Sequence, residues 1–250
     1  MGKPTPLLLR PNKATNRLYY RLTSRPHHFA LYRALVGEAV ARASAIVHLG
    51  AGSVFLGDVS DAPVDGKTIY AVEPDAESLA RNRAVNRICA GGESIPLPDA
   101  SVDAVVCEYV VEHLSEPQRV LKELRRILRP GGRFVFATPN AWSYSAIATR
   151  LTSQGFHEFF LARLKGVGGS ANEKPFPTSF RMNTRSQIES LARETGFCVR
   201  SLQSCVDHPT YTYPFPIVHQ LAALWHLLLD KLEVLEPLRI SWVGVLEKRR

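Results

Sequence analysis

Residues suited to a nucleoside ligand follow two β-rich runs early in the chain. The tripeptide Gly-Ala-Gly at 50–52 follows the run 45–49, and its small side chains let backbone N–H groups approach a ligand closely. Glu73 follows the run 68–72, about 20 residues after this turn, a separation at which a carboxylate typically binds a ribose diol. The pattern predicts a nucleoside-containing cofactor across the ends of two adjacent parallel strands.

The turn lacks the full G-x-G-x-x-G fingerprint of dinucleotide-binding folds. Phe55 takes the third glycine position, so close packing of a helix beneath a pyrophosphate is not supported. This disfavours a nicotinamide-dependent oxidoreductase. An ordinary βα turn without a cofactor remains an alternative for this stretch alone.

The surrounding segments predict the sheet that would position these residues. The run 102–107 is almost continuously apolar, which is typical of a strand buried on both faces of a parallel sheet. A helix is expected over 27–43, and another begins after Ser115, where Ser115 and Gln118 form a capping box and Pro117 lies in the first turn. Alternating strands and helices predict an α/β fold: a doubly wound, mostly parallel Rossmann-like sheet with a final antiparallel strand and helical and aromatic insertions.

The remaining segments divide the chain into a leading part, 1–44, and a main domain, 45–250. The leading part is expected to be a basic arm, irregular up to residue 26, followed by the helix over 27–43. The insertions 141–182 and 208–238 are interpreted as a substrate lid, and the apolar helix in the second insertion is expected to cover the edge of the sheet. The other expected helices are a short one within 53–66, one over 74–86, and one capped by Thr184 and Gln187 and ended by Gly196. Strands are expected near 88–89 and over 134–137, 197–206 and 240–246.

Composition indicates an ordinary globular protein. The 250 residues suit one domain with insertions, with 45% hydrophobic and 22% charged residues. The four cysteines include no C-x-x-C pair, which indicates reduced thiols and a cytoplasmic location. No signal peptide or membrane-spanning stretch is evident in the sequence.

Positive charge is concentrated in the leading part of the chain. The formal net charge is +8, and Glu38 is the only acidic residue before residue 45. Such an arm could make weak peripheral contact with an anionic membrane, bind an acidic substrate, or simply be solvated. No nucleic-acid partner is expected, because the stretch TPNAW at 138–142 lacks the tandem prolines of the N-P-P-[YF] motif.

Four segments in order resemble the class I S-adenosylmethionine-dependent methyltransferases, in particular the small-molecule group called type 11. They are VHLGAG, YAVEPD, GGESIPLPDASVDAVVCEYVVEHL and KELRRILRPGGRFVFATPN, within residues 45–140. The resemblance implies an enzyme that uses S-adenosylmethionine to methylate a small-molecule acceptor, which the insertions suggest to be apolar or lipid-like. It leaves open whether the nucleophile is oxygen, nitrogen or carbon.

The resemblance also implies roles for individual residues. Three residues, Gly50, Ala51 and Gly52, would line the methionine part of the cofactor. Glu73 would hold the ribose and Pro74 would approach the adenine, as would the loop of Gly92 and Glu93. Glu108 and Tyr109, after the fourth strand, would run along the cofactor toward the acceptor.

Two positions depart from the family pattern. His48 takes a position where the family usually has an acid, and Gly91 replaces an aspartate of the adenine loop. His48 can still make one hydrogen bond in the cofactor site, and the alternative is a buried core histidine. Glu93 is a candidate replacement for the missing acid. These losses keep open a catalytically silent relative that serves as a binding or scaffold protein.

His113 is the candidate catalytic base, because histidine titrates near neutral pH and this one follows the fourth strand. The alternative is that it packs at the strand-to-helix turn. His157 and His208, in the insertions, are weaker candidates. No metal ligand set is expected, and the oligomeric state is left open.

Overall fold

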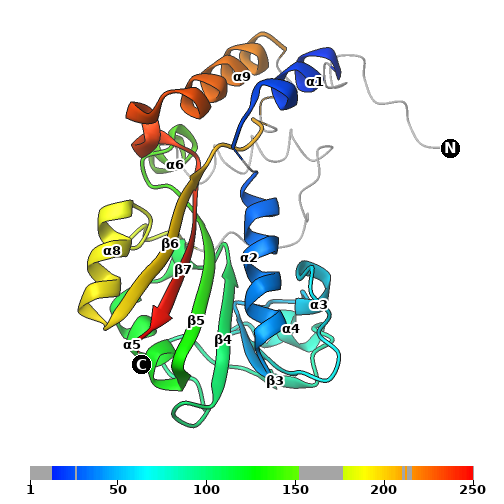
Figure 1. Ribbon diagram of the computed structural model, residues 1–250, viewed down its shortest axis with the longest axis vertical. Coiled ribbons are helices and arrows are strands. Elements are labelled where there is room, and N and C mark those ends of the chain that lie inside the picture. Colours follow the sequence, from blue (N-terminus) through cyan, green and yellow to red (C-terminus); the bar gives the residue numbers. More distant parts are fainter. Residues whose placement is uncertain (1–12, 26, 152–176, 210–211, 213–215, 250) are drawn as a thin grey trace, which may run out of the picture.

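A seven-stranded sheet with helices on both faces forms the centre of the molecule (Figure 1). The computed structural model describes residues 13–25, 27–151, 177–209, 212 and 216–249. The strands are β1 (Ala45–Leu49), β2 (Thr68–Val72), β3 (Asn86–Ile88), β4 (Val102–Glu108), β5 (Leu128–Pro139), β6 (Phe197–Cys205) and β7 (Ser241–Lys248). The helices are α1 (Lys13–Leu22), α2 (His28–Arg42), α3 (Leu56–Val59), α4 (Ala76–Ala80), η2 (Val111–His113), α5 (Pro117–Ile127), α6 (Tyr144–Leu151), α8 (Arg185–Glu194), α9 (Pro216–Lys231) and η4 (Glu233–Leu238).

The strand order β3-β2-β1-β4-β5-β7-β6 confirms the expected fold class. The first five strands pair in parallel, and β7 is inserted antiparallel between β5 and β6. The order reverses at β1, which pairs with β2 on one side and β4 on the other. In open α/β sheets, ligands bind outside the carboxyl ends of the strands at such a switch point.

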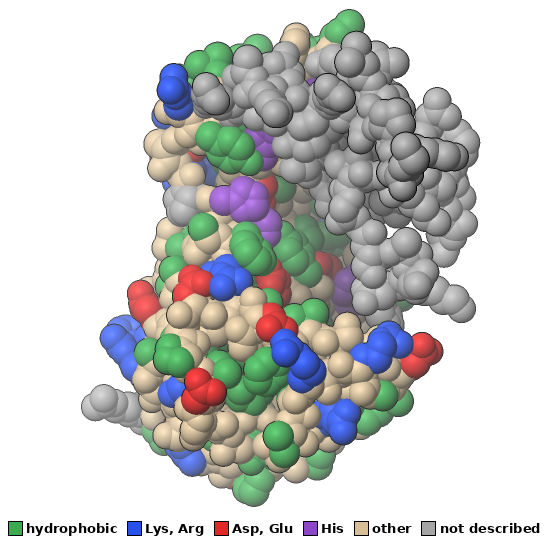
Figure 2. Space-filling model, turned by 90° about the vertical axis from the view of Figure 1, so that its right-hand side faces the viewer, with side chains coloured by type: hydrophobic (Ala, Val, Ile, Leu, Met, Phe, Trp, Pro, Cys, Tyr) green, Lys and Arg blue, Asp and Glu red, His purple; other side chains and the backbone are tan. Residues whose placement is uncertain are grey.

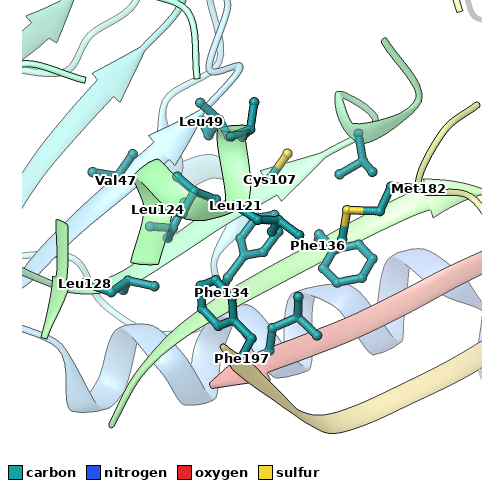
Figure 3. Close-up of a cluster of buried hydrophobic side chains, with 14 of the residues drawn as sticks. Val47, Leu49, Cys107, Leu121, Leu124, Leu128, Phe134, Phe136, Met182 and Phe197 are labelled. Carbon is teal, nitrogen blue, oxygen red and sulfur yellow. The ribbon is translucent and has the colours of Figure 1, made fainter. Parts of the chain in front are cut away.

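Apolar side chains on both faces of the sheet explain why it is buried between helices. On one face Cys107 and Phe136 pack with residues of α5 and α8 (Figure 3). On the other face Val106 and Val135 pack with residues of α2. Because alternate residues of β4 and β5 point to opposite faces, the nearly continuous apolar runs are what a doubly covered sheet requires.

Three local expectations were wrong. Residues 13–22 form helix α1, which packs against α9 where an irregular lead-in was expected. The capping box at Ser115 does not form, because Glu116 is the N-cap residue of α5 and makes no side-chain cap bond. Helix α4 has only five residues, because Asn82 turns its amide toward the carbonyl groups of Gly52 and Val54.

The apolar helix of the second insertion does not cover the sheet edge. Helix α9 lies with α1 away from the sheet (Figure 1) and leaves Ile217, Leu221 and Leu224 exposed. In the part of the chain that the structure describes, no helix has the length and apolarity needed to cross a membrane. The aromatic part of the first insertion falls largely on 152–176, outside the described residues.

Candidate functional site

The glycine turn after β1 has a backbone that ordinary side chains would disturb. Gly50 has φ +66°, and its N–H donates to the Val72 carbonyl at 2.8 Å, which ties the turn to the end of β2. A Cβ at Gly50 would lie 2.2 Å from Val110 Cγ2, so only glycine fits. Gly52 has φ +47° and open space where a Cβ would be. Backbone groups of the turn can therefore be approached closely by a ligand.

Glu73 is fixed at the end of β2, beside this turn. Its side chain is buried, and its two oxygens accept backbone N–H bonds from Gly52 and Asp75, each at 3.0 Å. A carboxylate has about four lone-pair sites, so each oxygen keeps capacity for one further donor. Two vicinal hydroxyls are a suitable pair of donors for a carboxylate held in this way.

His48 lies in β1, two residues before the turn. Burial lowers the pKa of its imidazole to about 4, so the side chain is neutral near pH 7. Its Nδ1 is buried and makes no hydrogen bond to any group the structure describes. A buried polar atom without a partner is costly, which suits a position that a ligand or water completes.

The carboxylate of Glu93 fills the space next to Gly91. A Cβ at Gly91 would lie 2.5 Å from Glu93 Oε2. The replacement of the missing acid by Glu93 stays a prediction. Gly92 is buried against Val120 and Leu49, whereas Pro74 is exposed at the neighbouring strand end.

The end of β4 brings two more of the candidate residues to the same edge. Glu108 is half-buried, and burial raises the pKa of its carboxyl, although the charges of His28 and Arg33 oppose the rise. Tyr109 follows with φ +53°, a conformation that costs a non-glycine residue about 1–2 kcal/mol. Its N–H donates to the Ala137 carbonyl at 2.9 Å, and its hydroxyl lies 2.6 Å from His28 Nε2.

The histidines proposed as bases lie in different surroundings. His113 is in η2, and its Nδ1–H donates to the Pro177 carbonyl at 3.0 Å. Its role as a base stays a prediction. His208 stacks on Tyr20 with ring centroids 5.2 Å apart, near α1 and α9, and His157 is outside the described residues.

Three residues near the β4 end were missed by the sequence analysis. Glu112 is buried, accepts a hydrogen bond from Thr138 Oγ1 at 3.1 Å, and has a pKa raised by burial. His28 and Asp207 contact each other and come from segments about 180 residues apart. The one sequence signal was the pair His27–His28 at the start of a helix, which by itself indicates no partner.

Comparisons with known proteins give the class to which this arrangement belongs. A family profile described as "Methyltransferase domain" matches residues 47–136. A probable S-adenosylmethionine-dependent methyltransferase of Mycobacterium tuberculosis is 32% identical over 122 residues, which cover 47% of this chain and 43% of the relative. The match thus spans less than half the length of that curated relative.

Two solved structures share the fold over most of the chain. A SAM-dependent methyltransferase from Thermotoga maritima aligns with a TM-score of 0.55 and 18% identity, over 95% of this chain and 96% of the other. Geranyl diphosphate C-methyltransferase from Streptomyces coelicolor, solved with Mg²⁺, geranyl diphosphate and S-adenosyl-L-homocysteine, aligns with a TM-score of 0.54 and 12% identity, over 88% and 77%. Residues 47–136 therefore form a class I methyltransferase domain, of the S-adenosylmethionine-dependent type.

Proposed function

We propose that the protein binds S-adenosylmethionine at the ends of β1, β2 and β4 and transfers its methyl group to a small-molecule acceptor. The observation that carries this proposal is the carboxylate of Glu73, held by two backbone N–H groups beside the open turn at Gly52. That arrangement presents two oxygens to a diol. It fits the ribose of a nucleoside better than it fits a phosphate, which a carboxylate would repel.

Different residues of the chain would bind different parts of the cofactor. Gly50, Ala51 and Gly52 would contact the methionine part. His48, whose Nδ1 has no hydrogen-bond partner among the described residues, lies at the end of the strand that leads into this turn. Glu73 would bind the ribose, with Pro74, Gly92 and Glu93 around the adenine. When bound, the sulfonium supplies an activated methyl group, so the protein mainly needs to align an acceptor and exclude water.

An apolar or amphipathic acceptor is the substrate class we favour. The exposed leucines of α9, with Trp142 and Tyr144 at the start of the first insertion, give apolar surface on the side of the sheet that carries α1 and α9. The structural relative from Streptomyces coelicolor is a methyltransferase of a prenyl diphosphate, by its name. We propose the same broad chemical character for this acceptor, without that molecule's identity.

Isothermal titration with S-adenosylmethionine and S-adenosylhomocysteine tests the cofactor assignment. Micromolar binding of both is expected, and Glu73→Ala should weaken it by about 10²-fold, because two hydrogen bonds to a charged group are lost at roughly 1.5 kcal/mol each. The matched control is Glu77→Ala, which removes the same charge from the exposed face of α4. Its affinity should equal that of the wild type.

The other possible outcomes of the titration would lead to different conclusions. A wild-type protein that binds neither molecule would favour a catalytically silent scaffold, with His48 and Gly91 as the departures that explain it. Binding of NADH alone would overturn the methyltransferase assignment. Equal weakening by Glu73→Ala and Glu77→Ala would mean that Glu73 acts only through its charge.

A further inference from the structure

Five histidines gather around one buried carboxylate, Asp207, beyond the end of β6. In Figure 2 histidine side chains are seen together in the upper half of the face. His27 and His28 contact the Asp207 carboxylate, and the imidazole of His226 contacts its backbone carbonyl. The other two, His208 and His219, have ring centroids 5.2 Å apart and lie beside His226.

One line of contacts leads from this cluster to the candidate site. Asp207 Oδ2 lies 2.7 Å from His28 Nδ1, and His28 Nε2 lies 2.6 Å from the hydroxyl of Tyr109. The contact lacks the geometry of an aligned hydrogen bond, so Asp207 acts on the neutral ring through its negative charge. Tyr109 directly follows β4, next to the valine that packs against Gly50. The line therefore joins a buried acid to the edge where the cofactor would lie.

The surroundings of Asp207 keep its carboxyl ionised. Burial alone would raise the pKa, but the contacts with His28 and His27 outweigh it and hold the pKa below its ordinary range. The backbone N–H of His28 donates to Oδ1 at 2.9 Å, and Ser241 Oγ donates to Oδ2 at 3.1 Å. An anion beside Nδ1 favours the tautomer with its proton on that nitrogen, which leaves Nε2 to accept the proton of Tyr109.

A metal site is the alternative for His27, His28 and Asp207, whose ligand atoms lie within 4.8 Å of one another. The N-terminal cap of α2 argues against it. His27 Nδ1 accepts the N–H of Phe29 at 3.3 Å, and burial lowers the pKa of its ring, so the neutral imidazole carries its proton on Nε2. That nitrogen faces Asp207, and it could bind a metal ion only if its proton moved to Nδ1, which would break the cap of α2.

We propose that Tyr109, His28 and Asp207 form a proton relay that deprotonates the acceptor. This inference rests on the proposed methyl transfer and narrows its substrate class. The acceptor would carry its reactive atom as a hydroxyl or an ammonium group, because a carbon–carbon double bond has no such proton to give before it attacks. Tyr109 is the catalytic residue, and His28 and Asp207 act through it as positioning residues.

The protons and electron pairs in this step balance. The acceptor O–H or N–H bond breaks and its proton goes to Tyr109 Oη, while the phenolic O–H bond breaks and that proton goes to His28 Nε2. The electron pair left on the acceptor forms the bond to the methyl carbon, and the sulfonium leaves as a neutral thioether. The imidazolium is stabilised by Asp207 and later releases its proton to water.

Acetylation of Tyr109 by N-acetylimidazole tests the relay without cofactor or acceptor. The phenol attacks the reagent and must lose its proton, so His28 should accelerate the reaction. Mass spectrometry of the peptide that contains Tyr109 would follow the rate at pH 7.5, with Tyr20, which is also exposed, as the internal control. His28→Gln should slow Tyr109 by at least about tenfold, a threshold set below the ~10²–10⁴-fold that a positioned base supplies, and leave Tyr20 unchanged.

A second variant and a spectrum keep the proposal falsifiable. Asp207→Asn, checked for folding by circular dichroism, should slow Tyr109 less than His28→Gln does. ¹⁵N spectra of the histidines should give His28 as the Nδ1–H tautomer, with a shift on Tyr109→Phe. An unchanged acetylation rate in His28→Gln, or an Nε2–H tautomer, would overturn the relay. Stoichiometric binding of Zn²⁺ that is lost in Asp207→Asn would overturn it in favour of the metal site.

The same experiments separate this inference from the proposed function. Titration with S-adenosylmethionine depends on Glu73, whereas acetylation depends on His28 and needs no cofactor. A protein that binds the cofactor but shows no effect of His28 on Tyr109 keeps the methyltransferase assignment and loses the relay. If Tyr109 is acetylated rapidly through His28 but no cofactor binds, the methyltransferase assignment is wrong and the proton relay is supported.

Discussion

The two buried ionisable residues at the ends of β1 and β2 differ in their hydrogen bonds. Glu73 is buried but receives two backbone N–H bonds, which compensate a carboxylate for lost water. His48 is buried with an unpaired Nδ1, so its neutral form is favoured. The family's acid at this position would add a negative charge near a cationic cofactor, and His48 adds none. In the proposed site, cofactor affinity should therefore depend more heavily on Glu73 and on the backbone of the turn.

The buried imidazole of His48 predicts an acid-sensitive fold. Its pKa is about 4 in the folded chain and 6.5 when exposed, so the unfolded state binds more protons between these values and stability falls as pH falls. From about pH 7.5 to about pH 5 this residue should remove roughly 2 kcal/mol from the free energy of unfolding. Urea denaturation of wild type and His48→Asn at both pH values would measure it. An equal loss in the two proteins would contradict the assignment, since His48→Asn removes only this titration.

The two helices with capping sequences behave differently, although both look alike in sequence. At α8, Thr184 and Gln187 form the full capping box, with Thr184 Oγ1 accepting from Gln187 N at 3.3 Å. At α5 the chain enters through Glu116, and Ser115 is exposed. Thr184→Ala should therefore cost about 1 kcal/mol of unfolding free energy, whereas Ser115→Ala, the matched control, should stay within about 0.5 kcal/mol. Equal losses in chemical denaturation would show that Ser115 caps its helix in solution.

Sequence patterns predicted those elements whose signal is local or periodic. The buried strand β4, helix α2 and the glycine turn follow from residues close in sequence, and the alternation of strands and helices predicts the doubly wound, mostly parallel sheet. Helix α1 was missed because it is stabilised by packing on α9, and Ser24, just after it, donates to Asp230, about 200 positions away. The contact of His28 with Asp207 was missed for the same reason, because no periodicity in the sequence links the end of β6 to the start of α2.

At the scale of the whole molecule, helix α9 turns polar side chains toward the protein and apolar side chains toward solvent. The face toward the protein carries His219, His226 and Asp230, all buried, and Asp230 accepts hydrogen bonds from Ser24 and Arg25. The outer face is apolar, with Leu221 64% and Leu224 57% exposed. The chain as a whole carries a formal charge of +8. An apolar helix face on a cationic protein is a combination that binds to anionic bilayers from the surface, without spanning them.

This surface predicts that the protein sediments with anionic vesicles at low salt. Vesicles of phosphatidylcholine and phosphatidylglycerol should carry down the wild type, and vesicles of phosphatidylcholine alone should carry down less. Leu221→Glu with Leu224→Glu should weaken partitioning by about 10²-fold, because each buried leucine contributes roughly 1.5 kcal/mol. The matched control is Val85→Glu, which places a new acid at a valine that is 92% exposed between α4 and β3. If the wild type stays in the supernatant, the prediction that the outer face of α9 binds anionic bilayers is wrong. If Val85→Glu lowers binding as much as the double variant, net charge and not the helix face holds the protein to the vesicle.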